Sequence, residues 1–296
     1  MSEAIAVVRA SRPNFLVLAP LCVGLGVAVA WQQGETPALL DTLLVFVGAL
    51  LAHAAVNLLN EYEDFVSGLD LITTRTPFSG GSGALPEAPG AAKRVLAAAI
   101  GTLALVILIG LYFLWQRGLP MLVLGTAGVA LVLTYTRWIT RSPLLCLLAP
   151  GIGFGPVMIL GTLVALGAKL DATAITVSVI SLLLVSELLL INQIPDAEAD
   201  RKIGRRHLVI TLGTLAAARL VSALFAAGYA VLITGILAGW LPLPSILSLV
   251  TAPFALWLAC KLPGAIDQPD ALNVMLGINV AILLATLALL IVGLSL

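Results

Sequence analysis

Two short polar stretches, residues 60–70 and 192–201, hold seven of the fifteen carboxylates in the chain. Each stretch follows a long apolar run. Carboxylates gathered without partners repel one another, which raises their pKa values and opposes ionisation. A divalent cation removes that penalty, and carboxylate oxygens are ligands that Mg²⁺ prefers. The two stretches therefore predict a two-part metal site beside apolar segments.

The first stretch predicts one polar helix face that carries Asn57, Asn60 and Asp64 at spacings of three and four. His53 extends this face one turn deeper into the apolar run. Gly68 is expected to end the helix, which would place Asp70 in the following loop.

The second stretch repeats the pattern, with Asn192, Asp196 and Asp200 spaced by four. Pro195 interrupts it, because proline lacks a backbone N–H and clashes inside a helix. We therefore expect a kink or a break before Asp196.

Basic residues near both stretches would neutralise a diphosphate held by Mg²⁺; they are Arg75, Arg137, Arg141, Arg201, Lys202, Arg205 and Arg206. The alternative for these bases is anchoring at anionic headgroups. The alternative for the acidic stretches is a solvated loop. Two acidic stretches with the same spacing, each beside a basic cluster, favour the metal site.

The composition is that of a polytopic membrane protein, all-α and of a single domain over residues 1–296. The chain is 60% hydrophobic and only 10% charged, with a mean hydropathy of +1.12, whereas a soluble domain is about one quarter charged. A net charge of zero gives no basic face for nucleic acid. The three cysteines lie in separate apolar runs without metal-ligand spacing.

Nine apolar runs are long enough to span a membrane, near residues 14–32, 38–60, 93–115, 119–136, 143–166, 172–192, 213–239, 243–261 and 272–294. They are continuous rather than alternating, so they predict helices arranged in one bundle around a central cavity. Ala28-Val29-Ala30 would also fit a signal-peptidase site, but the first run is long enough to stay as a span.

Lysine and arginine predict the orientation of these spans. With nine spans, twelve of the fifteen basic residues fall on the side of the N-terminus and two on the other side. The positive-inside rule then makes the N-terminus cytoplasmic and the C-terminus external, in a bacterial or archaeal cytoplasmic membrane. The motif loops, about 61–92 and 193–212, would both face the cytoplasm, and the central cavity would open there.

The chain resembles the UbiA superfamily of intramembrane prenyltransferases over nearly its whole length. The resemblance rests on Asn60-x-x-x-Asp64 followed by Asp70, and on Asp196-x-x-x-Asp200. Weaker matches are Arg12-Pro13, Tyr135-Thr136, Gly155-Pro156, Asp200-Arg201 through Gly204, and Leu212-Gly213. Residues 57–70 are most similar to the menaquinone-pathway branch, which prenylates dihydroxynaphthoate.

The resemblance implies the chemistry. Two Mg²⁺ ions would bridge a polyprenyl diphosphate to the Asp motifs and promote ionisation to an allylic cation, which the ring carbon of an aromatic acceptor attacks with loss of a proton. It implies catalytic roles for Asp64, Asp196, Asn60 and Asn192, and metal binding by Asp64, Asp70, Asp196, Asp200, Asn60 and Glu61. Glu61 stands where the family usually has Asp, and His207 where Thr is common.

An acceptor pocket is predicted from His53, Asn57, Tyr62, Tyr135 and Glu187. The tyrosine rings would steady a carbocation, although both also fit a place at the membrane interface. His53 and Glu187 could instead be hydrogen-bonded core residues. The glycine-rich loop 76–83 is either a mobile lid over the site or a flexible connector.

Three functions compete at this point: an aromatic prenyltransferase for quinone biosynthesis, another UbiA-type enzyme, and a cation- or proton-coupled transporter. The second class includes terpene cyclases and transferases to haem, chlorophyllide or a glycerol phosphate. Transporters usually carry their ionisable groups near the membrane midplane. Here the carboxylates gather at one interface, which favours an enzyme.

Overall fold

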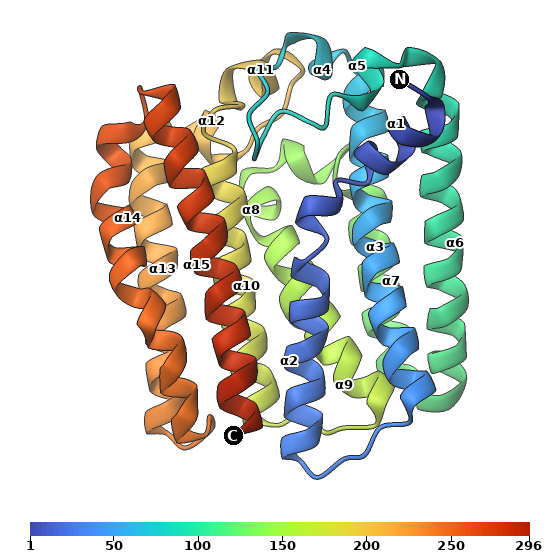
Figure 1. Ribbon diagram of the computed structural model, residues 1–296, viewed down its shortest axis with the longest axis vertical. Helices are drawn as coiled ribbons and strands as arrows, with labels where there is room; N and C mark the ends of the chain where they lie inside the picture. The colour runs from blue at the N-terminus through green and yellow to red at the C-terminus, as the bar shows by residue number, and fades with distance from the viewer.

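The computed structural model describes residues 1–296, and all its regular elements are helices (Figure 1). The long helices are α2 (Leu18–Gln32), α3 (Leu39–Val66), α6 (Ala92–Arg117), α7 (Leu119–Thr134), α10 (Ala172–Asn192), α13 (Thr214–Leu237), α14 (Ala252–Ala265) and α15 (Pro269–Ser295). A further rod is built from α8 (Pro143–Ile152), the π-helical η4 (Gly153–Leu160) and α9 (Gly161–Leu166). The predicted all-helical bundle is confirmed.

Short helices lie at one end of this bundle, at the top of Figure 1. They are α1 (Glu3–Ala10), α4 (Leu69–Ile72), α5 (Ala84–Glu87), α11 (Ala197–Lys202) and α12 (Leu208–Leu212). The N-terminus lies at this end and the C-terminus at the opposite end. Both acidic stretches are therefore at the same end of the bundle as the N-terminus.

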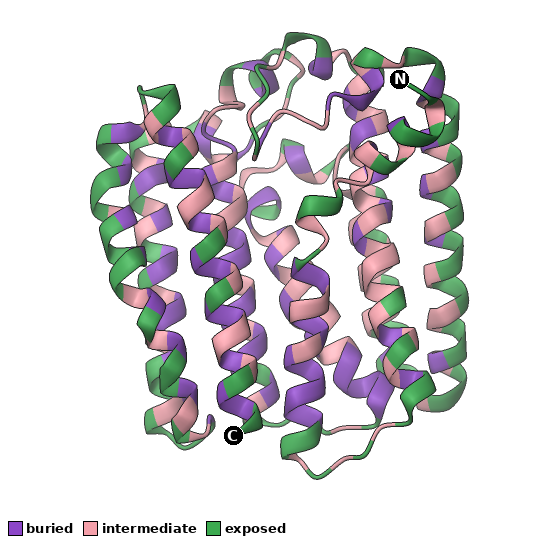
Figure 2. Ribbon diagram, viewed as in Figure 1, coloured by how far each residue is buried: buried purple, intermediate pink, exposed green.

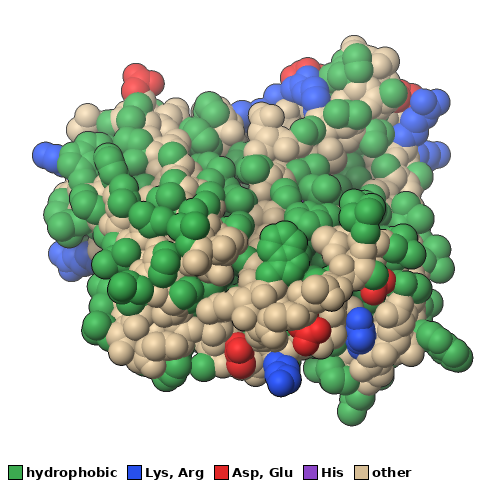
Figure 3. Space-filling view, turned by 60° about the horizontal axis from the view of Figure 1, so that its bottom comes forward, with side chains coloured by type: hydrophobic (Ala, Val, Ile, Leu, Met, Phe, Trp, Pro, Cys, Tyr) green, Lys and Arg blue, Asp and Glu red, His purple; other side chains and the backbone are tan.

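Each of the nine predicted runs is helical, and seven helical segments have the length and apolarity of a membrane span. Residues Glu3–Phe15 and Leu18–Gln32 form a pair bent by 49°, which would make an eighth span. Helix α7 is apolar but shorter. Exposed residues lie on the outward faces of the helices (Figure 2), and hydrophobic side chains cover much of the surface in Figure 3. An apolar outer surface of this kind is typical of a multi-pass membrane protein.

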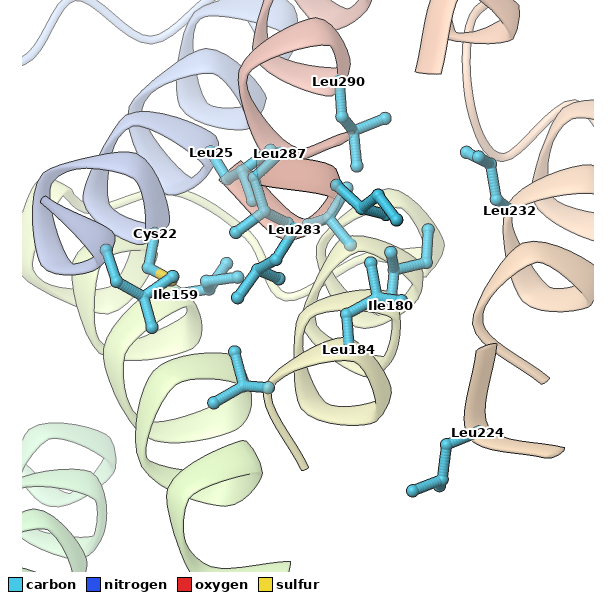
Figure 4. Packing of buried hydrophobic residues seen from close by; sticks show 14 of the residues in the cluster. Cys22, Leu25, Ile159, Ile180, Leu184, Leu224, Leu232, Leu283, Leu287 and Leu290 are labelled. Atoms are coloured by element: carbon cyan, nitrogen blue, oxygen red, sulfur yellow. The ribbon is translucent and has the colours of Figure 1, made fainter. Parts of the chain in front are cut away.

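The main core lies where α2, η4, α10 and α15 meet, and Figure 4 shows part of it. Leu25, Ile159, Ile180 and Leu283 are almost completely buried there. Leucine and isoleucine fill such a core in well-defined rotamers. This core fixes α10, which carries the second acidic stretch at its C-terminal end.

Glycines allow α8 and η4 to lie directly on α10. A Cβ on Gly151 would lie 2.4 Å from the carbonyl oxygen of Leu182, and one on Gly155 would lie 2.4 Å from that of Ser178. Small residues four positions apart are the usual means of close helix contact in membranes. The two helices therefore approach until their backbones nearly touch.

Both predicted helix ends are confirmed. Helix α3 ends at Val66, and Gly68 follows with φ 81°, a left-handed conformation that glycine adopts without steric cost. Asp70 then lies in the short helix α4 rather than in an open loop. Helix α10 ends at Asn192, and α11 begins at Ala197, so the chain breaks around Pro195 as predicted.

Candidate active site

A cavity of about 890 Å³ runs through the bundle from the acidic stretches toward the opposite end. At its deep end it is lined by Leu44, Leu114 and Met121, near the far ends of α3, α6 and α7. Most of its lining is hydrophobic. The cavity thus joins a polar head region to a long apolar channel.

The predicted polar faces both line this cavity. From α3 come His53, Asn57, Asn60 and Asp64, and from the second stretch come Asn192, Asp196 and Asp200. Asp70 and Tyr135 line it as well. Helical spacing on α3 and the break at Pro195 therefore bring the two stretches to one place.

Arg205 joins the two acidic stretches. Its guanidinium pairs with Asp64, and its Nη1 lies 2.9 Å from Asp200 Oδ1. Burial by itself would lower the pKa of Arg205, but Asp64 and Asp200 raise it above its ordinary value. His207 Nε2 lies 3.0 Å from the other oxygen of Asp200, so both oxygens of that carboxylate have partners.

The glycine-rich loop 76–83 lies directly over the carboxylates. The backbone N–H of Gly80 donates to Asp196 Oδ2 at 3.1 Å. Ser82 donates to Glu61 from both its backbone N–H, at 3.0 Å, and its hydroxyl. Gly81 has φ 79°, and a Cβ there would lie 2.8 Å from Asp70 Oδ1. The loop therefore caps the site through backbone amides that only a glycine-rich segment can bring so close.

Two carboxyl groups outside the spans have pKa values close to neutral pH. Burial, reinforced by the charge of Glu61, raises the pKa of Asp70 to about 7. Burial and the charge of Asp200 raise the pKa of Asp196 to about 7. A bound cation would displace the proton from each group, as metal binding to carboxylates generally does.

The free oxygen atoms of the site fit a hard cation. Asp70 Oδ2, Asp196 Oδ1 and Asn192 Oδ1 are buried without a hydrogen-bond partner, and all three residues line the cavity. Mg²⁺ takes oxygen ligands and keeps several positions for water or phosphate. No three carboxylate, histidine or cysteine side chains lie close enough to form a complete metal cluster. The protein thus offers a partial set of ligands, which suits an ion that shares its ligands with a substrate.

Several predicted site residues lie outside the cavity. Arg137 pairs with Glu63 at 3.0 Å, and Lys202 pairs with Glu198 at 3.5 Å, both with exposed side chains. Arg141 and Arg201 are exposed, and Arg75 lies 3.7 Å from Glu87. Tyr62 packs with a separate small core beside α1 and α6. Glu187 is fully buried away from the cavity lining.

Arg12, His207 and Ser82 contact the acidic groups but were not among the predicted site residues. Nη2 of Arg12 lies 3.3 Å from both Asn60 Oδ1 and Glu61 Oε2. In sequence, Arg12 is 48 positions from Asn60, and no local spacing connects them. The sequence did single out His207, because it stands next to the second motif at a position where the family that the chain resembles commonly has threonine.

Comparison with known proteins decides the family. A model of the UbiA prenyltransferase family matches residues 17–283. The chain belongs to this family. It is 30% identical over 241 residues to the 1,4-dihydroxy-2-naphthoate octaprenyltransferase of Bacillus subtilis, which covers 78% of this chain and 75% of that protein. The protein is therefore a prenyltransferase of the UbiA type.

Solved structures share the fold of this UbiA prenyltransferase. A UbiA homologue from Aeropyrum pernix K1 superposes with a TM-score of 0.73 at 20% identity, over 94% of this chain and 98% of that one. A homologue from Archaeoglobus fulgidus bound to DMAPP and Mg²⁺ gives 0.65 at 17% identity, over 96% and 98%. At these low identities the likeness shows that the helices share one arrangement.

Proposed function

We propose that this protein transfers a polyprenyl group from its diphosphate to an aromatic acceptor of the naphthoate type, in the biosynthesis of a menaquinone-type quinone. The observation that carries the proposal is the cavity, with buried free oxygens at one end and a long apolar channel at the other. The channel suits an isoprenoid tail, and the polar end suits a diphosphate and its counter-ion. The relative from Bacillus subtilis acts on 1,4-dihydroxy-2-naphthoate.

Asp70, Asp196, Asn192, Asp64 and Asn60 would hold Mg²⁺, as its carboxylate and amide ligands. When bound, Mg²⁺ neutralises the diphosphate and so stabilises it as a leaving group. The Archaeoglobus homologue, whose structure contains DMAPP and Mg²⁺, supports a role for Mg²⁺ itself. Two ions would suit two acidic stretches, since each stretch presents its own free oxygens.

The protein's own residues position the reactants. Arg205 lies between Asp64 and Asp200 and supplies positive charge where diphosphate charge develops. The C–O bond between the allylic carbon and the diphosphate breaks, and the diphosphate keeps the electron pair. The acceptor's ring carbon then forms the new C–C bond, and the ring regains aromaticity when that carbon gives up the group it carried: a proton, to water, or the carboxylate, as CO2. Tyr135 lines the cavity at this end and offers its ring to the cation.

The loop 76–83 would act as the lid. In this structure its amides occupy Glu61 and Asp196, which are also candidate metal ligands. Binding of an ion at these carboxylates would free the loop from them. The loop would then close over the substrates and exclude water from the allylic cation.

Metal removal tests the proposal directly. We expect EDTA to abolish prenyl transfer from octaprenyl diphosphate to 1,4-dihydroxy-2-naphthoate, and Mg²⁺ to restore it. Without a cation between them, the carboxylates of the site repel the diphosphate. Product formation in detergent or lipid, followed by chromatography, is the measurement. Full activity after exhaustive chelation would exclude a metal-dependent mechanism.

Topology offers a second test. Nine spans with the N-terminus in the cytoplasm would place the acidic site on the cytoplasmic side. Reporter fusions at Ser2 and at Leu296 are expected to report opposite sides of the membrane. Both ends on one side would mean that one run, with the short α7 as the first candidate, does not cross.

A further inference from the structure

Arg12 has an unusual backbone for its residue type. It is the one non-glycine residue with a positive φ, at φ 51° and ψ 64°, and proline follows it. The left-handed conformation is unfavourable for an L-residue, and residues before proline normally prefer extended backbone. Asn57 Nδ2 donates to the carbonyl of Ser11 at 3.0 Å and holds the neighbouring backbone in place. Strained residues fixed in this way cluster at ligand-binding sites.

The side chain of Arg12 has hydrogen-bond donors to spare. A guanidinium carries five N–H groups. Nη2 contacts Asn60 and Glu61, whereas Nε is buried without a partner. Both oxygens of Glu61 already accept hydrogen bonds from Ser82. Arg12 can therefore bind a further anionic group.

Only two cationic side chains, Arg12 and Arg205, line the main cavity. Arg205 is already shared between Asp64 and Asp200, on the side where the diphosphate is expected. Arg12 instead contacts Asn60 and Glu61, at the mouth of the smaller cleft described below. Arg12 pairs with one carboxylate where Arg205 pairs with two, and its Nε has no partner, so Arg12 keeps a donor for a second anion.

A smaller cleft of about 390 Å³ lies next to Arg12. Its walls come from residues 8–15 and 76–82, and only three of its twelve lining residues are hydrophobic. Arg12, Phe15 and Phe78 line both this cleft and the main cavity. The cleft is thus a polar passage with two aromatic rings at its junction with the site.

We propose that this cleft admits and binds the aromatic acceptor, and that the Arg12 guanidinium binds the acceptor's carboxylate. The phenylalanine rings suit a flat aromatic ring system, and a guanidinium binds a carboxylate through two parallel hydrogen bonds. The inference rests on the proposed function, since it assumes an acceptor that carries a carboxylate. It gives the acceptor an entrance separate from the apolar channel of the prenyl tail.

The test compares two ligands that differ only in the carboxylate, 1-hydroxy-2-naphthoate and 1-naphthol. Their dissociation constants are measured by calorimetry on the wild type and on Arg12→Gln, so the result does not depend on turnover. We expect Arg12→Gln to weaken binding of the naphthoate by roughly 10–100-fold and to leave that of naphthol nearly unchanged. The KM for the prenyl diphosphate is expected to stay the same.

Two further variants separate binding from folding. Arg12→Gly removes the guanidinium and suits the left-handed backbone, so it is expected to lose naphthoate binding while the protein still folds, although Glu61 loses its ion pair. Arg94→Gln removes an arginine that pairs with Glu3 at the surface, outside both cavities, and is expected to bind both ligands normally.

An unchanged ratio of the two dissociation constants in Arg12→Gln would overturn the proposal. A rise in the KM for the prenyl diphosphate with unchanged naphthoate binding would overturn it too and would assign Arg12 to the diphosphate. The proposed function fails in a different way, by absence of prenylated product from wild-type protein with any aromatic acceptor.

Discussion

Asp64→Ala and Asp196→Ala are each expected to lower kcat by at least about 100-fold, the loss typical for removal of one electrostatic element of an active site. Asp64 faces the cavity from α3 and pairs with Arg205. Asp196 presents a buried free oxygen from the turn after α10. Each loss would remove negative charge from the place where a cation must bind. Steady-state turnover with octaprenyl diphosphate and a panel of aromatic acceptors measures the effect.

The double variant is expected to lose much less than the product of the two single losses, because residues that act as one unit are not additive. Asn60→Ala and Asn192→Ala are expected to lower kcat less than the Asp variants do, since an amide oxygen brings no net charge to the metal. Asp267→Ala is the matched control, because Asp267 is exposed at the turn before α15 and lies outside the cavity. Near-normal turnover of Asp64→Ala, or losses that simply multiply, would contradict a shared diphosphate site.

The sequence predicted the parts of the site that depend on local structure. The spacing of His53, Asn57, Asn60 and Asp64 defines one helix face, and that face lines the cavity. Gly68 ended its helix because glycine tolerates the left-handed conformation. Local rules of this kind need no knowledge of what surrounds the helix.

Contacts between distant segments could not be predicted. Arg205, rather than Arg137, reaches Asp64, because the turn after α11 folds over α3 while Arg137 meets Glu63 on the outside. Glu187 lies on a helix that is apolar on all sides, so periodicity gave no indication of which neighbour it faces. The loop 76–83 carries no apolar pattern, so the sequence left a lid over the site and a flexible connector as alternatives, and its contact with Asp196 comes from tertiary packing.

Gly155→Leu is expected to separate α8 and η4 from α10 and to destabilise the protein. A side chain at this position meets the carbonyl oxygen of Ser178 and the backbone N of Leu182, at 2.4 and 2.9 Å from the Cβ. Backbone atoms cannot rotate away as a flexible side chain can, so the helices must move. Overpacking typically costs about 1–3 kcal/mol, which corresponds to a melting temperature lower by roughly 2–12 °C.

The displacement would also reach the active site. Phe154 on η4 packs edge-on against His53, with ring centroids 4.8 Å apart, and both residues line the cavity. Thermal unfolding in detergent and turnover are therefore expected to fall together. Gly101→Leu is the control, because a side chain there meets open space on α6. Equal melting temperatures and equal turnover for Gly155→Leu and Gly101→Leu would contradict this prediction. The close contact between η4 and α10 would then not be needed to hold the second acidic stretch against the first.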